Sequence, residues 1–215
     1  MNRLIYHLLS SKFGARLEIE ILMRQTARAF LKDEDASKSP LIRKQSRDCR
    51  SMASASNSRD ARRAKNSGVW RCAASASARL SNQELLDRYA RFTAGAVRRA
   101  INNGQDMKQL HQRLYRMARY LGTQLRRWLK PENKRECQAV IALLYHNIGI
   151  NIKESSHGKF TVQKCYFSTF YTPDICAVIS AIDQGIFAGI YGRGKLTFRE
   201  RITEGRHTCK ASLFS

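Results

Sequence analysis

The residues of this chain that could do chemistry gather in its last fifty or so positions. They are three thiols and two carboxylates: Cys165, Cys176, Asp183, Glu204 and Cys209. Thiolates are nucleophiles, and positioned carboxylates act as general acids or bases. This short stretch therefore contains the side-chain types from which a nucleophilic or acid/base site can be built.

The spacing of these residues predicts which of them can meet. Cys176 and Asp183 lie seven residues apart on a predicted helix, which is two turns, so they share one face. Asp183 interrupts an isoleucine-rich surface of that helix. A carboxylate in that position is either a structural acid or a functional one with a raised pKa.

The two other thiols fall on predicted strands. Strict alternation of side chains would place Cys165 on the face opposite Lys164. Cys209 begins the last strand, and antiparallel pairing with the strand before it would bring Arg199 or Arg201 close to Cys209. An arginine there would favour the thiolate and could also bind a carboxylate.

The first half of the chain is predicted to be helical. Apolar residues recur at helical spacing in residues 15–31, 81–104, 106–129 and 132–146. Ser81 and Glu84 form a capping box at the start of the second of these segments. Cys137 falls on the apolar face of the fourth segment, so we expect it in the core.

Beyond Gly149 the apolar period changes from about 3.6 to 2 residues, which indicates strands. A hairpin with its turn at 155–158 is followed by a helix that starts at Thr172-Pro173-Asp174, a strong N-terminal signal. Strands at 195–202 and 208–214 complete the pattern. The predicted fold class is α+β, with a helical N-terminal half followed by an antiparallel β-β-α-β-β unit.

Composition divides the 215 residues into three parts. Residues 1–36 read as an N-terminal amphipathic helix, and residues 81–215 as the main domain. Between them, residues 37–80 are rich in Ser, Ala and Arg and poor in large apolar side chains. This segment is predicted to be a disordered linker, or else a reading-frame artefact that joins two genuine halves.

Charge, apolar runs and cysteine spacing restrict the class of protein. The formal charge is +22, and residues 38–79 contribute eleven Lys and Arg against two Asp. No apolar run approaches the roughly 18 residues of a membrane span, and no secretory signal is evident. The six cysteines lack zinc-site spacing, so we expect reduced thiols in a cytoplasmic protein, with no metal, no other cofactor and no membrane partner.

The segment from Phe160 to Phe214 resembles the bacterial L-2-amino-thiazoline-4-carboxylic acid hydrolases. The resemblance rests on the order of motifs: the strand 162–166 with Cys165, the helix with Cys176 and Asp183, and the closing 201–205 followed by Cys209. It implies a small-molecule substrate that carries a carboxylate, and hydrolytic opening of a thiazoline ring to carbamoyl-cysteine.

The resemblance also implies roles for particular residues, with alternatives left open. Glu204 or Asp183 would be the acid/base, and Cys165 or Cys209 the nucleophile or a thiol lining the site. Arg199 or Arg201 would bind the substrate carboxylate. His207 is a further candidate for proton transfer.

Two other classes of function compete with the hydrolase. The same layout is similar to the ligand-binding domain related to bacteriochlorophyll vinyl reductases, which would make the chain a non-catalytic small-molecule-binding module. Nucleic-acid binding through the basic helices ranks last, because residues 37–79 offer only Trp70 as an aromatic partner for bases.

Overall fold

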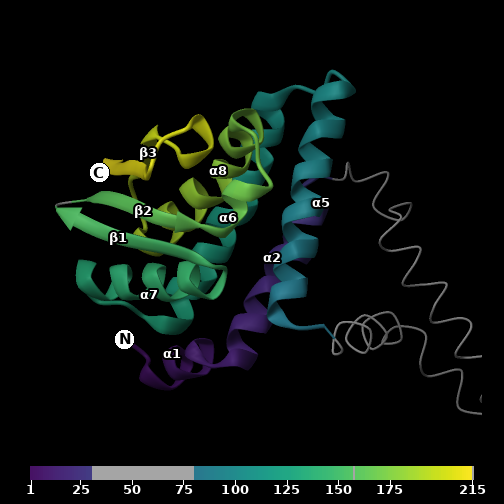
Figure 1. Cartoon of the computed structure of the whole chain (residues 1–215). Coiled ribbons are helices and arrows are strands. Elements are labelled where there is room, and N and C mark those ends of the chain that lie inside the picture. Colours follow the sequence, from purple (N-terminus) through teal and green to yellow (C-terminus); the bar gives the residue numbers. More distant parts are fainter. Residues whose placement is uncertain (31–79, 157, 215) are drawn as a thin grey trace, which may run out of the picture. The chain divides into compact units, whose positions relative to one another are not determined.

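The chain is an α+β protein, as predicted (Figure 1). The computed structural model describes residues 1–30, 80–156 and 158–214. The predicted linker or frame artefact at 37–80 therefore lies outside the described residues, apart from Leu80. Met1–Phe30 and Leu85–Ser215 form one compact unit, so the N-terminal helices belong to the same unit as the main domain.

The helices begin and end close to the predicted positions. They are α1 (Arg3–Ser10), α2 (Lys12–Phe30), α5 (Asn82–Asn102), α6 (Met107–Leu129), α7 (Lys134–Asn147) and α8 (Pro173–Tyr191). The short helix α1 was not predicted, because its apolar run is only about two turns long. It is capped by Asn2, whose side chain accepts a hydrogen bond from the backbone N–H of Ile5 at 3.4 Å.

Capping explains where two of the helices start. The Ser81–Glu84 capping box is confirmed: the Glu84 carboxylate accepts from the Ser81 N–H at 2.6 Å, and the Ser81 hydroxyl accepts from the Glu84 N–H at 3.2 Å. Asp106 caps α6 through the N–H groups of Lys108 and Gln109. The sequence motif at Thr172 predicts a capping bond by its hydroxyl group. Thr172 occupies the N-cap position of α8 but makes no side-chain capping bond, so that part of the prediction was wrong.

Four antiparallel strands form one sheet in the order β1-β2-β4-β3. They are β1 (Ile150–Ser156), β2 (Lys159–Cys165), β3 (Lys195–Glu200) and β4 (Cys209–Phe214). Helix α8 connects β2 to β3, which completes the predicted β-β-α-β-β unit. The third strand is shorter than predicted, because residues 202–204 form the 3₁₀ helix η3 (Ile202–Glu204).

Helix α8 is the centre of the core, with the sheet on one side and α6 on the other (Figure 1). Towards the sheet, the ring of Phe187 packs edge-on against Phe160 of β2 at 4.9 Å. Towards α6, glycine residues of α8 contact the backbone of α6 directly. A Cβ on Gly185 would lie 2.5 Å from the Tyr115 carbonyl oxygen, and one on Gly189 would lie 2.5 Å from the Arg119 carbonyl oxygen. The two helices can approach this closely only because these positions lack side chains.

By length and composition, α8 is also the one helix among the described residues that could cross a membrane. However, 61% of its apolar window is buried inside the protein. The core helix of a folded domain meets the same length and composition criteria, and the packing of α8 against the sheet and α6 accounts for its apolar character.

Candidate functional site

A β-bulge turns Cys165 towards α8. In the pairing of β1 with β2, Asn151 lies opposite Lys164 and Ile152 lies opposite Val162, so Gln163 is an extra residue. A bulge shifts the alternation by one position. Cys165 therefore faces the same side as the buried Val162, while Lys164 is exposed. Cys165 and Lys164 therefore lie on opposite faces, as alternation predicted, but the bulge turns Cys165 rather than Lys164 to the side of Val162.

A second β-bulge, in the pairing of β3 with β4, turns Arg201 inward. In the pairing of β3 with β4, Phe198 lies opposite Ala211 and Glu200 lies opposite Lys210, which leaves Arg199 as the extra residue. Arg199 is exposed, whereas only 18% of the Arg201 side chain is exposed. Of the two arginines left open by the sequence, the structure therefore turns Arg201 inward.

The thiols and Asp183 converge on the face of the sheet that α8 covers. Cys209 reaches this face by simple alternation along β4, and its Sγ accepts from the Ile202 N–H at 3.3 Å. The negative charge of Asp183 raises the pKa of all three thiols. The positive charge of Arg201 lowers the pKa of Cys176, Asp183 and Cys209. We refer to Cys165, Cys176, Asp183, Arg201 and Cys209 as the Asp183 cluster.

Asp183 is a largely buried carboxyl with a raised pKa. Its Oδ1 accepts a hydrogen bond from the Tyr145 hydroxyl at 2.7 Å. Burial raises the pKa of the carboxyl from 3.8 to about 6, and the Tyr145 hydrogen bond and the positive charge of Arg201 only partly oppose this rise. The side chain still keeps some solvent exposure. A carboxyl with a pKa near neutrality can both accept and return a proton.

The thiols of the cluster are held in the protonated form. Burial raises the pKa of Cys165, Cys176 and Cys209, and for Cys165 it does so to about 12. At neutral pH such a thiol is ionised in only about 1 molecule in 100,000. Arg201 lowers the pKa of Cys176 and of Cys209, as expected for an arginine, but burial outweighs it. The expected arginine-stabilised thiolate is therefore not formed.

Arg201 has unused hydrogen-bonding capacity. Its Nη1 pairs with Glu204 Oε1 at 3.2 Å, and its guanidinium lies 5.2 Å from the centre of the Phe198 ring. Its Nε is buried and has no hydrogen-bond partner among the described residues. Glu204 lies at the edge of the cluster with 38% of its side chain exposed, where it orients Arg201.

Sequence reasoning missed the hydroxyl groups that surround Asp183. The apolar periodicity of the helices places Tyr89 and Tyr145 on buried faces, where nothing in the pattern distinguishes them from other core residues, and Tyr171 lies outside any periodic segment. Tyr171 pairs with the Thr93 hydroxyl at 2.6 Å, and Tyr89 pairs with the Thr26 hydroxyl at 3.2 Å. A phenol on a buried stripe needs a hydrogen-bond partner, and this is the signal that could have identified them.

The N-terminal helix α2 adds a second buried acid nearby. Burial raises the pKa of Glu18 from 4.5 to about 8, although its Oε2 accepts from Asn147 Nδ2 at 2.9 Å. The negative charge of Glu18 raises the pKa of Tyr145, whose hydroxyl group donates a hydrogen bond to Asp183. The surroundings of the cluster therefore include a residue from the segment that the sequence analysis had treated as a separate N-terminal part.

The other candidate residues lie outside the cluster. His207 is exposed in the loop between β3 and β4, and Cys137 is buried on α7, where the sequence predicted it. Within the part of the chain that the structure describes, no three His, Cys, Asp or Glu side chains are arranged to hold a metal ion. Cys137 and the three thiols of the cluster are all unbridged.

Comparison with protein-family models, curated proteins and solved structures finds no match to this chain. The chemistry of the cluster must therefore be argued from its own geometry.

Proposed function

We propose that this chain hydrolyses a small cyclic amidine that carries a carboxylate, such as L-2-amino-thiazoline-4-carboxylate, and opens the ring to carbamoyl-cysteine. One observation supports this above the others. A carboxyl whose pKa lies near neutrality, Asp183, and an arginine with a buried unpaired nitrogen, Arg201, lie close together beside three thiols. A hydrolase of this class needs an acid/base and a cation that binds the substrate carboxylate.

In the proposed reaction, Asp183 activates water. Tyr145 occupies Oδ1 and leaves Oδ2 to accept a proton from the water molecule. The water oxygen then bonds to the amidine-like carbon, and one ring bond at that carbon breaks. Asp183 returns its proton to the sulfur as the ring carbon–sulfur bond breaks. The second proton of the water moves from the new hydroxyl group to the ring nitrogen, and the water oxygen becomes the carbonyl oxygen.

Arg201 binds the substrate carboxylate in this proposal. Glu204 and the Phe198 ring hold its guanidinium from two sides, so little side-chain freedom is lost when an anion binds. The thiols line the site and stay protonated, which favours attack by water over attack by Cys165 or Cys209. Of the two acids left open by the sequence, Asp183 is the better base because Glu204 is more exposed and is already paired.

The test is turnover of L-2-amino-thiazoline-4-carboxylate, followed by mass spectrometry of the carbamoyl-cysteine product. We expect Asp183→Asn to lower kcat by about 10²–10⁴-fold, the typical contribution of general acid–base catalysis. Arg201→Ala should mainly raise KM. Arg199→Ala is the matched control, because Arg199 lies two residues away on the outward face, and it should leave both constants unchanged.

The possible outcomes test the assigned base, the assigned carboxylate site and the catalytic activity separately. Full activity of Asp183→Asn would remove the assigned base. Equal effects of the two arginine substitutions would remove the assigned carboxylate site. Absence of turnover by the wild-type chain together with saturable substrate binding would favour the second candidate, a non-catalytic ligand-binding module. The protonated state of all three thiols is compatible with that candidate.

A further inference from the structure

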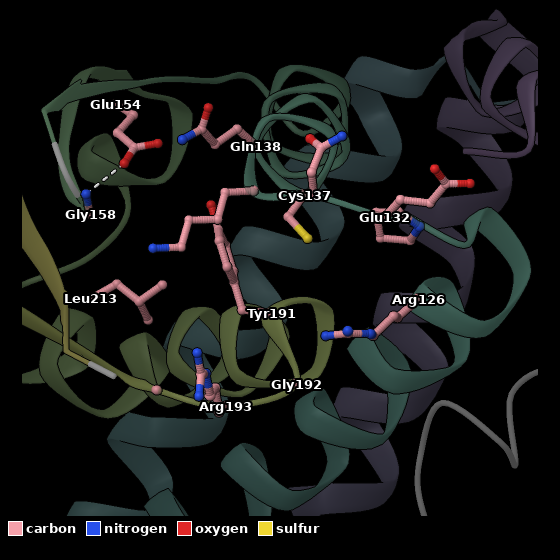
Figure 2. Close-up of a pocket in the computed structure, with 14 residues that line it drawn as sticks. Arg126, Glu132, Cys137, Gln138, Glu154, Gly158, Tyr191, Gly192, Arg193 and Leu213 are labelled. Carbon is pink, nitrogen blue, oxygen red and sulfur yellow. Dashed lines mark hydrogen bonds between the residues drawn. The ribbon is translucent and has the colours of Figure 1, made fainter.

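A pocket of about 770 Å³ lies at the C-terminal end of α8, away from the Asp183 cluster (Figure 2). Eight residues separate Asp183 from Tyr191, which lines the pocket, and this corresponds to about 12 Å along the helix. The volume lies within the range typical of small-molecule sites, roughly 300–1,000 Å³. Neither the proposed hydrolysis nor the sequence analysis assigns a role to this pocket.

Three cationic side chains are among the residues that line the pocket: Arg126, Lys134 and Arg193. Arg126 is held in place, because its Nη1 donates to the Ile190 carbonyl oxygen at 3.0 Å near the end of α8. Glu132 also lines the pocket, but its side chain is 81% exposed and solvent screens its charge. The lining around Arg126 therefore favours an anionic group.

Another part of the pocket offers two polar atoms without partners. Glu154 Oε1 accepts from the Gly158 N–H at 2.6 Å, but Glu154 Oε2 is buried with no hydrogen-bond partner among the described residues. The Tyr191 hydroxyl is buried and unpaired in the same way. The two groups are neighbours, since the charge of Glu154 raises the pKa of Tyr191 in addition to the larger effect of burial.

Unpaired buried polar atoms destabilise the fold, and a ligand that satisfies them recovers the lost free energy. A carboxylate oxygen accepts hydrogen bonds only, so the ligand group beside Glu154 has to be a donor, and a protonated amine suits its charge. Binding in this way requires a rotamer change of Tyr191 or Glu154 that uncovers these atoms, and rotamer changes at binding surfaces are common.

We infer that this pocket binds a small zwitterion with its protonated amine at Glu154 and Tyr191 and its anionic group at Arg126. Figure 2 shows Glu154 and Arg126 at opposite sides of the pocket, with Tyr191 and the Cys137 thiol between them. The amine and the anionic group therefore belong at opposite ends of an elongated molecule. This inference does not depend on the proposed hydrolase activity.

The test uses probes that share one carbon skeleton: 6-aminohexanoate, hexanoate and hexylamine. Binding to the full chain is measured at low salt by isothermal titration calorimetry or ligand-observed NMR. We expect 6-aminohexanoate to bind at least about tenfold more tightly than either singly charged probe. Shorter and longer ω-amino acids then locate the best spacing between the charges.

Two variants test the amine site, and two serve as controls. Glu154→Gln keeps the Oε1 acceptor for Gly158 and should abolish the advantage of 6-aminohexanoate over hexanoate, while Tyr191→Phe should reduce it. Glu200→Gln removes a carboxylate on the outward face of β3, where it pairs with Lys210, and should change nothing. Arg201→Ala should also leave binding unchanged, which separates this pocket from the Asp183 cluster.

The inference is overturned if no ω-amino acid binds saturably to the wild-type chain, or if the three probes bind equally. It is also overturned if Glu154→Gln, with a circular dichroism spectrum like that of wild type, keeps the preference for the amine. Loss of binding in Arg201→Ala would place the zwitterion at the other site and would equally overturn it.

Discussion

Replacement of Asp183 by asparagine should stabilise the folded chain at neutral pH while it removes the proposed catalytic base. Burial raises the pKa of this carboxyl from 3.8 to about 6. Each pKa unit corresponds to about 1.4 kcal/mol, so ionised Asp183 costs the folded state about 3 kcal/mol. The folded chain binds the Asp183 proton more tightly than the unfolded chain does. The stability that this proton provides is therefore fully present below pH 3.8 and is lost as the pH rises through about 6.

Asparagine has nearly the same shape, keeps an acceptor for Tyr145 and carries no charge. The free energy of unfolding is measured by urea denaturation of wild type and Asp183→Asn from about pH 3.5 to about pH 8. The difference between the two curves should grow by about 3 kcal/mol across this range, in favour of the variant. Other titrating groups, including Glu18, whose pKa is also raised, contribute equally to the stability of both proteins. Their contributions therefore cancel in the difference between wild type and variant.

Asp174→Asn is the matched control, since Asp174 is an exposed acid in the first turn of the same helix. It should lower stability slightly, by about 0.3–1 kcal/mol, because it removes a favourable charge at a helix N-terminus. A parallel pair of curves for wild type and Asp183→Asn would refute the reasoning, because it would mean that the Asp183 carboxyl is not desolvated in the folded chain.

Three further predictions follow from the same contacts. Gly189→Ala should destabilise the chain by about 2 kcal/mol or more, because the new Cβ would meet the backbone of α6 at Arg119 and Thr123. Gly95→Ala, whose Cβ would meet only the flexible end of Arg99, should be neutral or stabilising in the same urea titration. Tyr145→Phe removes a hydrogen bond that lowers the pKa of Asp183, so the acidic limb of the kcat/KM profile should move to higher pH; an unmoved limb would argue against Asp183 as the base. Cys165 should react with iodoacetamide at neutral pH at least about 100-fold more slowly than free cysteine, since burial raises its pKa to about 12, and rapid alkylation would restore it as a candidate nucleophile.

Local sequence signals predicted most of the fold. The capping box at Ser81 and Glu84 and Pro173 at the start of α8 mark helix starts within a residue or two of the observed positions. These signals depend on groups only a few residues apart in the chain, so they can be read directly. Helix α1 was missed because two turns give too few periods for a pattern to be recognised.

The composition of the candidate site was predicted less completely. The sequence named Cys165, Asp183, Glu204 and Cys209 as catalytic candidates, and it left Arg199 and Arg201 as alternatives for the substrate carboxylate. In the structure Glu204 lies at the exposed edge of the cluster. The sequence did not identify Tyr145 as the partner of Asp183, since a tyrosine on an apolar helix face looks like any other core residue until its hydroxyl has a neighbour.

By itself, the sequence determined the residue types available for chemistry. It also determined the α+β class and most of the longer helices and strands, because these depend on local periodicity and capping. Only the tertiary structure decided which side chains face one another. The bulges at Gln163 and Arg199 exist because one strand carries an extra residue relative to its partner. That mismatch is a property of two paired strands, and no single strand records it. It directs Cys165 and Arg201 towards Asp183, and burial among these groups then sets the protonation states on which the proposed chemistry depends.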